Sequence, residues 1–400
     1  MPADAVDPHL RMTAAAAPAR ATSERRPKVL IVGQGPPTTG GIPTFVTLLS
    51  QDAWLIERAE VRLLNTTPRG TKLPGSLSLS NLWFAASDAT RVFFFGRQHD
   101  VVHLNLAATP MLPLVRAMLL CLSGRAAGCA VVLHLHTGEI PACLERRRYR
   151  RLFRLVMRLV DVMIVVSRDA EKAVKALGGE VVRMENGVPV ASYEVGPKEE
   201  PPLITFVGTV CERKGVVELH DALLEVRHEL PQLPFRLLIV GDSKQEGPGV
   251  FQRMLRLYDD ADFDVEFTGS VDPVMVRDIL SRSSMFCLPS YSEGFPIALL
   301  EAMAAGAAIV ASDVGDVASM LDGGTAGVLV PPRVTGALAD AVSNLLLHPD
   351  QRESLGQRAR ARAEDQYDLR KAVSRVHELY RTCVTMSDGV VAGRNRSGRR

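Results

Sequence analysis

Short runs of β-branched and other apolar residues alternate with amphipathic stretches along most of the chain. This alternation is typical of buried parallel strands connected by helices, so the expected fold class is α/β. It predicts six strands in the first half of the chain, at Val29–Gly33, Val61–Asn65, Val101–Asn105, Ala130–His134, Val162–Val166 and Val181–Met184. It predicts six more in the second half, at Leu203–Gly208, Arg236–Gly241, Val265–Gly269, Met285–Leu288, Ala308–Ala311 and Gly327–Val330.

The alternation breaks between Pro189 and Pro202, where prolines and charged residues predict a domain linker at residues 191–202. We therefore expect two Rossmann-like parallel-sheet domains facing a cleft, the first at residues 27–190 and the second at residues 203–367. A C-terminal helix at about residues 368–384 is expected to pack back on the first domain. Residues 1–26 and the basic tail 387–400 lack a sustained period and are predicted to be disordered.

The 400-residue length agrees with two domains, because single cores stop growing at about 250–300 residues. A composition of 46% apolar and 23% charged residues excludes a fibrous, disulfide-scaffolded or wholly disordered protein. The net charge of +2 gives no overall field that would attract nucleic acid. No apolar run reaches the roughly 20 residues of a spanning helix, and Asp4 and Asp7 interrupt the place of a secretory signal, so we expect a cytoplasmic protein.

The six cysteines contain no C-x-x-C pair, so neither a disulfide framework nor a zinc site is expected. The candidate chemistry lies instead in loops after the strands, because ligands of open parallel sheets bind beyond the carboxyl ends of the strands. Loops 33–44, 134–140, 208–215 and 289–296 should converge on one cleft.

The most informative segment is S-Y-S-E-G-F-P-I-A-L-L-E-A-M-A-A-G at residues 290–306, which follows a strand and continues into a helix. Proline suits the first helical position, so the helix is expected to start at Pro296 and to stop at Gly306. The free amides of residues 297–299 and the positive end of the helix dipole then form an anion site suited to a diphosphate.

Two glutamates flank this site. Glu301 lies about 7.5 Å along the helix axis, at the distance of a ribose attached to that phosphate, and its carboxylate can accept from two ribose hydroxyls. Glu293 lies just outside the helix, where the dipole favours its ionised form, and it would face a sugar on the other side of the phosphate. For an isolated pair of glutamates, a helix cap and a solvated side chain would be an equally good interpretation, but the surrounding sequence favours the functional one.

This segment resembles the signature of the retaining glycosyltransferases of family 4, the group 1 family. Other features of that family follow in order across residues 28–383, at Gly40-Gly41, His136, Val166-Ser167, Asn186–Val188, Val207-Gly208, Lys214-Gly215 and Val240–Asp242. The resemblance implies the two-domain GT-B fold and a UDP- or GDP-sugar donor held mainly by the C-terminal domain. It also implies a hydroxyl acceptor on the N-terminal domain, retention of anomeric configuration, and no metal or other cofactor.

By resemblance, Glu293 is the carboxylate beside the donor sugar, and Glu301 is the one that binds ribose. Lys214 would neutralise the diphosphate, and His136 would contact the sugar near the reacting carbon. A fixed ammonium and helix amides stabilise the leaving diphosphate most in the transition state. The remaining residues expected to bind substrate are Gly40, Gly41, Asn186, Arg213, Gly294, Phe295, Pro296 and Ile297.

The sequence departs from the family at Thr209, where the family commonly has arginine, and Arg213 is a candidate to supply the missing charge. Because of Thr209, a non-catalytic nucleotide-sugar sensor or scaffold on the same fold remains the alternative. Pro189 and Ser243 also replace residues that are frequent in the family.

Three competing motifs carry less weight. The loop Gly33–Gly41 has Thr38 where a dinucleotide fingerprint needs glycine, and Gly41 where a Walker A loop needs lysine. The D-x-D pairs within Asp260–Asp264 trail an amphipathic helix and indicate a solvated turn. His134 and His136 share one side of a strand, but spacing reveals no third metal ligand.

Residues 144–160 are predicted to form a basic amphipathic helix. Its arginines lie on one face, and its apolar face is expected to pack on the sheet through Leu152, Leu155, Val156 and Leu159. The arginine face suits anionic lipid headgroups, at about 1 kcal/mol per basic residue. On this basis we expect peripheral contact with the inner face of the membrane and a lipid-linked acceptor.

Overall fold

The computed structural model describes residues 25–67, 79–243, 246–247 and 249–397, and the side chains of these residues except those of 79, 80 and 387–397. Residues 1–24 of the predicted N-terminal extension lie outside this range. Its last two residues are placed: Arg25 donates to Asp100 at 2.6 Å, and Arg26 donates to the carbonyl of Ile56.

The N-terminal lobe contains a six-stranded parallel sheet in the order β2-β1-β3-β4-β5-β6. The strands are β1 Lys28–Gly33, β2 Glu60–Asn65, β3 Val101–Leu106, β4 Ala130–Leu135, β5 Val162–Val165 and β6 Val182–Arg183. Its helices are α1 Gly41–Gln51, α2 Ala53–Arg58, α3 Leu79–Gly96, α4 Met111–Ala126, α5 Ile140–Leu144, α6 Arg147–Met157 and α7 Arg168–Lys175. Strands β3 and β4 are buried at every position because helices cover both faces of the sheet.

The C-terminal lobe repeats this plan, with a parallel sheet in the order β12-β11-β10-β7-β8-β9. The strands are β7 Leu203–Val207, β8 Arg236–Val240, β9 Asp264–Gly269, β10 Met285–Leu288, β11 Ala308–Ser312 and β12 Val328–Val330. Its helices are α8 Val216–Glu229, α9 Val250–Tyr258, α10 Pro273–Arg282, α11 Ile297–Ala304, α12 Val317–Met320, α13 Thr335–Leu347 and α14 Pro349–Gln366, with 3-10 turns η2 Val190–Ser192, η3 Glu212–Lys214 and η4 Asp322–Gly324. The predicted fold class and all twelve predicted strands are confirmed.

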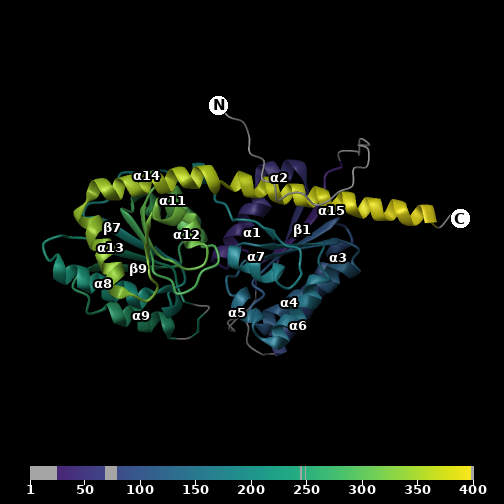
Figure 1. Cartoon of the computed structure of the whole chain (residues 1–400), viewed down its shortest axis with the longest axis horizontal. Coiled ribbons are helices and arrows are strands. Elements are labelled where there is room, and N and C mark those ends of the chain that lie inside the picture. The colour runs from purple at the N-terminus through teal and green to yellow at the C-terminus, as the bar shows by residue number, and fades with distance from the viewer. Residues whose placement is uncertain (1–24, 68–78, 244–245, 248, 398–400) are drawn as a thin grey trace.

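The chain crosses between the lobes a second time near residue 368. The amide of Val188 donates to the carbonyl of Tyr367 at 3.0 Å, and the amide of Leu369 donates to the carbonyl of Val188 at 2.8 Å. Helix α15, Leu369–Ser397, then runs along the N-terminal lobe beside α2 (Figure 1). Its buried residues join one apolar cluster with residues from both lobes, including Val29 and Leu300.

Helix α15 is longer than the sequence suggests, because residues 387–397 of the tail predicted to be disordered continue it. Extending a helix that is already docked adds one hydrogen bond per residue fixed, which costs far less than starting a new helix. Residues 398–400 lie outside the described residues.

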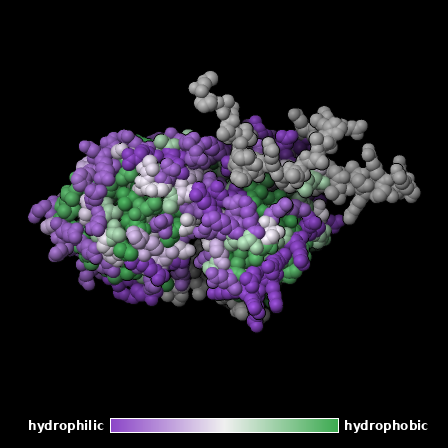
Figure 2. Space-filling model, viewed as in Figure 1, coloured by the Kyte–Doolittle hydropathy of each residue, from purple (hydrophilic) through white to green (hydrophobic). Residues whose placement is uncertain are grey.

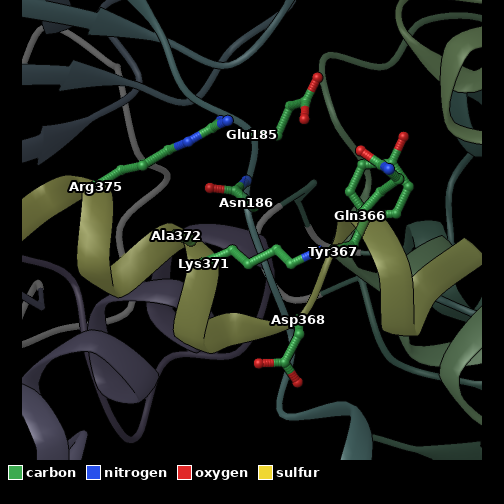
Figure 3. A pocket seen from close by; sticks show the side chains of 8 residues that line it. All are labelled: Glu185, Asn186, Gln366, Tyr367, Asp368, Lys371, Ala372 and Arg375. Atoms are coloured by element: carbon green, nitrogen blue, oxygen red, sulfur yellow. The ribbon is translucent and has the colours of Figure 1, made fainter. Parts of the chain in front are cut away.

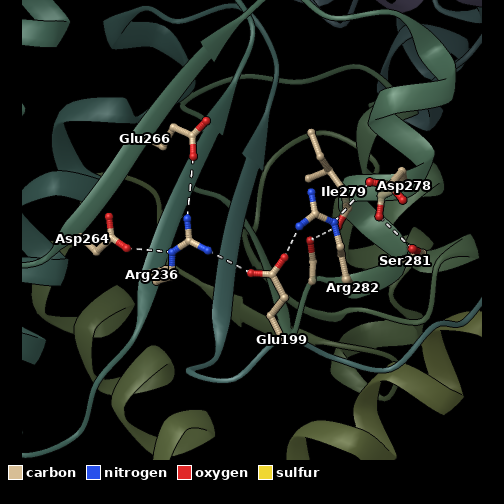
Figure 4. Close-up of polar contacts among 9 residues, drawn as sticks. Glu199, Arg236, Asp264, Glu266, Asp278, Ile279, Ser281 and Arg282 are labelled. Carbon is tan, nitrogen blue, oxygen red and sulfur yellow. Dashed lines mark hydrogen bonds and ion pairs between the residues drawn. The ribbon is translucent and has the colours of Figure 1, made fainter.

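The linker segment docks against the C-terminal lobe. Lys198 Nζ donates to the carbonyls of Ser281 at 2.9 Å and Ala305 at 3.2 Å. Glu199 accepts from Arg236 at 3.1 Å and from Arg282, and Arg236 also pairs with Asp264 at 2.7 Å (Figure 4). The charged residues Lys198 and Glu199 therefore attach the linker to the C-terminal lobe.

The basic segment forms α6, and its buried face differs in part from the predicted one. Tyr149, Phe153 and Val156 are buried, whereas Leu155 is 48% exposed. The spacing of the buried residues follows the 3.6-residue helical period, and Leu155 falls on the arginine face. The surface over α6 is predominantly hydrophilic (Figure 2).

Candidate active site

Loops from both lobes meet beyond the carboxyl ends of the strands, as predicted. A Cβ atom placed on Gly138 would lie 2.4 Å from the carbonyl oxygen of Glu293, so the loop after β4 touches the loop after β10. A Cβ atom on Gly41 would lie 4.0 Å from the side chain of Ile297. The amino end of α1 and the amino end of α11 therefore face one another across the gap between the lobes.

Lys214 and Glu293 form a close ion pair within this convergence. The Nζ atom of Lys214 lies 2.6 Å from Oε1 of Glu293, and their side chains are only 16% and 8% exposed. Turn η3 delivers the lysine and ends at Gly215, where φ is +73° and a Cβ atom would lie 2.0 Å from the carbonyl oxygen of Pro289. Only glycine fits there, which explains the Lys-Gly pair of the motif.

Helix α11 begins one residue later than predicted. Pro296 is the N-cap, with an extended backbone (φ −71°, ψ 117°), and Ile297 is the first helical residue. The ring excludes the helical conformation at the residue before a proline but not at the proline itself. In the structure Pro296 stands just before the helix, as its N-cap. At the other end, Gly306 follows the helix with φ +67°, as predicted. The unpaired amides remain those of residues 297–299.

The amino end of α1 lies opposite. Gly40 adopts φ +124°, and no neighbouring atom lies within 4 Å of a Cβ atom placed there. Conformation rather than crowding therefore favours glycine at this position. Its carbonyl accepts from the amide of Thr44 at 3.0 Å, which starts the helix.

Glu301 contacts the linker. The hydroxyl of Tyr193 donates to Oε1 of Glu301 at 2.9 Å. Burial raises the pKa of Glu301 to about 7, against the opposing effects of the Tyr193 hydroxyl and the charge of Arg277. A partly buried carboxylate with a single neutral donor retains the capacity to accept further hydrogen bonds.

His136 follows β4 and is held from the neighbouring strand. Its Nε2 atom lies 3.0 Å from Oδ1 of Asn105, and its ring stacks on that of His134 with centroids 4.0 Å apart. Burial, reinforced by His103, lowers the pKa of His136 to about 3, so the ring is neutral at ordinary pH. Asn105 was not among the residues predicted for the site, although it alternates with His103 at the end of a predicted strand, and that pattern was an available signal.

Three of the other predicted residues lie in different surroundings. Phe295 is buried and packs edge-to-face on Tyr367, with centroids 5.6 Å apart, so it belongs to the core that joins the lobes. Arg213 donates to the carbonyl of Ser292 at 3.5 Å and stands beside the ion pair. Gly294 contacts the opposite lobe, since a Cβ atom there would lie 2.8 Å from the amide nitrogen of Gly138.

Asn186 lines a second cavity, of about 130 Å³, beside the start of α15 (Figure 3). The other residues around that cavity are Glu185, Gln366, Tyr367, Asp368, Lys371, Ala372 and Arg375. The Asn-Gly pair is instead part of the crossover, because a Cβ atom on Gly187 would lie 2.8 Å from Cα of Leu369.

A larger cavity of about 660 Å³ opens between the lobes beside Glu293. Its N-terminal wall is made by Gly138, Glu139, Pro141, Ala142, Asp169, Lys172 and Ala173, and its C-terminal wall by Tyr291, Ser292, Glu293, Val314 and Gly315. It is large enough for a sugar-sized ligand.

One further contact that joins the lobes was not predicted from the sequence. The carboxylate of Asp316 accepts from the backbone amide of Arg168 at 3.0 and 3.1 Å, at the amino end of α7. Residues so far apart in the chain give no local signal of such a contact.

Among the described residues, no group of three or more His, Cys, Asp or Glu is arranged to hold a metal ion. The D-x-D residues lie at the amino end of β9, whereas the cleft lies beyond the carboxyl ends of the strands. Asp264 is the first residue of β9 and pairs with Arg236. None of the helices in the described part of the chain is both long enough and apolar enough to cross a membrane.

Comparison with known sequences agrees with this geometry. Residues 43–192 match the family described as "Glycosyltransferase Family 4", and residues 201–348 match "Glycosyl transferases group 1". A phosphatidyl-myo-inositol mannosyltransferase of Mycobacterium leprae is 30% identical over 335 residues, which are 80% of this chain and 84% of that protein. A glycogen synthase of Mycobacterium tuberculosis is 27% identical over 256 residues, 61% of this chain and 59% of that protein.

Solved structures share the fold. The Anabaena protein HepE in complex with UDP-glucose superposes with a TM-score of 0.70 at 17% identity, covering 89% of this chain and 100% of that one. Sucrose-phosphate synthase from Thermosynechococcus elongatus superposes with a TM-score of 0.72 at 18% identity, covering 90% and 100%. The two facing parallel-sheet lobes are thus the GT-B fold. With the matches to both halves of the chain, this shows that the chain belongs to the group 1, family 4 glycosyltransferases.

Proposed function

We propose that this glycosyltransferase transfers a sugar from a nucleoside diphosphate to a hydroxyl acceptor with retention of anomeric configuration. The observation that carries the proposal is the meeting of two helix amino ends, α1 and α11, next to the Lys214–Glu293 ion pair. Free amides and an ammonium directed at one place favour a diphosphate and stabilise the charge that it gains on leaving.

The donor is proposed to lie along α11. Its diphosphate would contact the amides of residues 297–299 and Lys214, and its ribose hydroxyls would donate to Glu301 in place of Tyr193. The donor is proposed to be a UDP- or GDP-sugar. HepE, which is in complex with UDP-glucose, supports a nucleotide sugar, and the mannosyltransferase relative supports transfer of a hexose. Lys214 would then exchange part of its contact with Glu293 for the diphosphate, leaving Glu293 to accept from hydroxyls of the sugar.

The chemical step needs no covalent intermediate. The bond between the anomeric carbon and the diphosphate oxygen breaks, and the acceptor oxygen bonds to the same face of that carbon. The acceptor proton passes to the leaving phosphate oxygen, which gains negative charge as the bond lengthens. His136 would lie against the sugar as a neutral ring, and Glu293 would stabilise the positive charge that develops on the sugar.

The acceptor is proposed to enter through the 660 Å³ cavity between Glu139 and Glu293. The arginines of α6 and the exposed Trp83 and Phe94 of α3, which are 66% and 59% exposed, support a lipid-linked acceptor at an anionic membrane surface. Helices α3 and α6 belong to the N-terminal lobe, which forms one wall of the cavity, so a lipid-linked acceptor bound to them would lie beside that lobe.

The test is release of nucleoside diphosphate from UDP- and GDP-sugars, with and without an acceptor panel. We expect Glu293→Gln to lower kcat by about a hundredfold with a small change in donor Kd, because its carboxylate acts mainly in the transition state. Glu301→Ala should raise donor Kd by about tenfold with a smaller effect on kcat.

Wild-type turnover in both variants would refute the assignment of these roles. A protein that binds the donor tightly but releases no diphosphate with any acceptor would instead be the nucleotide-sugar sensor that Thr209 suggests. Mass spectrometry and NMR of the product would establish the anomeric configuration and so test retention.

A further inference from the structure

Three imidazole rings lie one behind another inside the N-terminal lobe. His103 on β3 stacks on His134 on β4, with centroids 5.6 Å apart and planes 4° apart. His134 in turn stacks on His136, with centroids 4.0 Å apart and planes 28° apart. The side chains of His103 and His134 are completely buried, so the stack leads from the interior of the lobe to the cleft.

Each end of this histidine stack is fixed by a hydrogen bond. At the inner end, Nδ1 of His103 lies 2.6 Å from the hydroxyl of Tyr380, which comes from α15. At the cleft end, Nε2 of His136 lies 3.0 Å from Oδ1 of Asn105. The amide of Asn105 is oriented by its own Nδ2, which donates to the carbonyl of His103 at 3.4 Å. With its oxygen facing the ring, His136 carries its proton on Nε2.

The middle ring has no such anchor. Neither nitrogen of His134 has a hydrogen-bond partner among the described residues, and Nε2 of His103 has none either. His134 is held by its two ring neighbours and by the edge of Phe45, 5.2 Å away at 80°. Buried polar atoms without partners are rare, and they persist only where the surrounding packing fixes them.

All three rings are neutral. Burial lowers the pKa of His103 and of His136 to about 3, and it lowers that of His134 as well. A neutral stack transmits position through ring contact rather than through charge. The orientation of His134, and of His136 in contact with it, therefore depends on where the anchored ring of His103 lies.

We propose that Tyr380, His103 and His134 are positioning residues for His136. The proposal rests on the proposed function, in which His136 lies against the donor sugar, but the arrangement of the rings can be tested without it. Because Tyr380 belongs to the helix that begins at the crossover between the lobes, the geometry of His136 depends on the docking of α15.

The test is Tyr380→Phe, which removes only the hydroxyl from the full-length protein. The matched control is Tyr258→Phe, since that hydroxyl is also buried and donates to a backbone carbonyl, that of Val216 at 2.8 Å, but lies in the core of the C-terminal lobe. Long-range proton–nitrogen NMR of protein with labelled histidine reports the tautomer and surroundings of each ring, and single His→Gln variants assign the nine histidines.

We expect Tyr380→Phe to shift the NMR signals of the ring nitrogens of His103 and His136, while Tyr258→Phe leaves both unchanged. In donor turnover, Tyr380→Phe should lower kcat by about tenfold with little change in KM, because a small misplacement weakens contacts made in the transition state. A loss of stability without misplacement would leave the kcat of the folded enzyme unchanged.

The proposal is overturned if the His136 signals of Tyr380→Phe match the wild type, or if Tyr258→Phe produces the same changes. Where Tyr380→Phe does not fold, His103→Gln removes the inner ring instead and should shift the same His136 signals. If the wild type turns over no donor, the proposed function fails, and the NMR comparison still decides whether these residues position His136.

Discussion

Glu301 is the side chain through which pH should act on donor binding. Burial raises the pKa of its carboxyl to about 7, so it is protonated below that pH and ionised above it. Ribose hydroxyls donate to the ionised form, and the donor should therefore bind more tightly as pH rises through 7. We expect the Kd of the intact nucleotide sugar to fall roughly tenfold from about pH 6 to about pH 8, measured by calorimetry.

The intact nucleotide sugar is the right probe because its phosphates do not titrate in this range. The control is Glu301→Gln, which keeps the shape of the side chain and removes the titration, so its Kd should be nearly independent of pH. An equal pH dependence in the wild type and in Glu301→Gln would show that another group is responsible.

The site residues differ in how far the sequence reveals them. Glu293 and Lys214 come from two loops, each recognisable by a glycine that follows, and the structure brings them to 2.6 Å. The contact between Tyr193 and Glu301 spans 108 residues, and no local pattern predicts it. The same holds for His103 and Tyr380, whose pairing depends on how a distant helix docks on the sheet.

Among the structural elements, the linker gives a clear stability prediction. Glu199 joins Arg236 and Arg282, and hydrogen bonding to Asp264 with the surrounding carboxylates raises the pKa of Arg236 (Figure 4). We expect Glu199→Gln to lower the free energy of unfolding by about 1 kcal/mol, since the pairs are only partly exposed and share charges. Thermal unfolding at low and high salt measures the change, which should shrink as salt screens the network.

Glu229→Gln on α8 is the matched control, because Glu229 is exposed and makes no hydrogen bond or ion pair within the described part of the chain. It should leave the unfolding temperature unchanged. Equal effects of the two variants would mean that the Glu199 network does not hold the linker.

Most secondary-structure elements were predictable because each depends on local periodicity. The run of apolar residues in β4 and the glycine at the end of α11 are examples. The start of α11 was placed one residue early, since proline is compatible with both the N-cap and the first helical position. The predicted buried face of α6 was wrong at Leu155, which is exposed, whereas Tyr149 and Phe153 are buried by tertiary packing.

At the level of the whole molecule, Asp316 is expected to hold the lobes together. Its carboxylate accepts from the amide of Arg168, while Ser167 caps α7 from within the same lobe at 3.3 Å to Ala170. Replacing Asp316 removes the hydrogen bond that α7 receives from the opposite lobe and leaves the cap that Ser167 provides. We expect Asp316→Ala to increase the radius of gyration measured by small-angle X-ray scattering, with little change in unfolding temperature.

Asp313→Ala is the control, because Asp313 is exposed in the same loop and its side chain contacts no polar partner among the described residues. The radius of gyration of this variant should equal that of the wild type. If Asp316→Ala scatters like both, then the contacts of Gly138 with Glu293 and Gly294 suffice to keep the lobes closed.

The two-lobe plan followed from the sequence, since each lobe has its own βα series. The contact between the two lobes did not follow from the sequence. Gly138 and Gly294 come from opposite lobes, and each position requires only a small residue. A glycine in a loop has several explanations, and only the assembled lobes show that both glycines allow two backbones to touch.

The crossover also has a consequence for biosynthesis. Val373, Val376, Tyr380 and Cys383 of α15 lie in the same apolar cluster as Val29 and Ile31 of β1, so strands made early are covered by residues made late. On the ribosome, the N-terminal lobe would emerge with one face of its sheet open to water until the final helix leaves the exit tunnel. A nascent chain stalled before residue 369 should therefore recruit chaperones to that face, whereas the completed polypeptide should not.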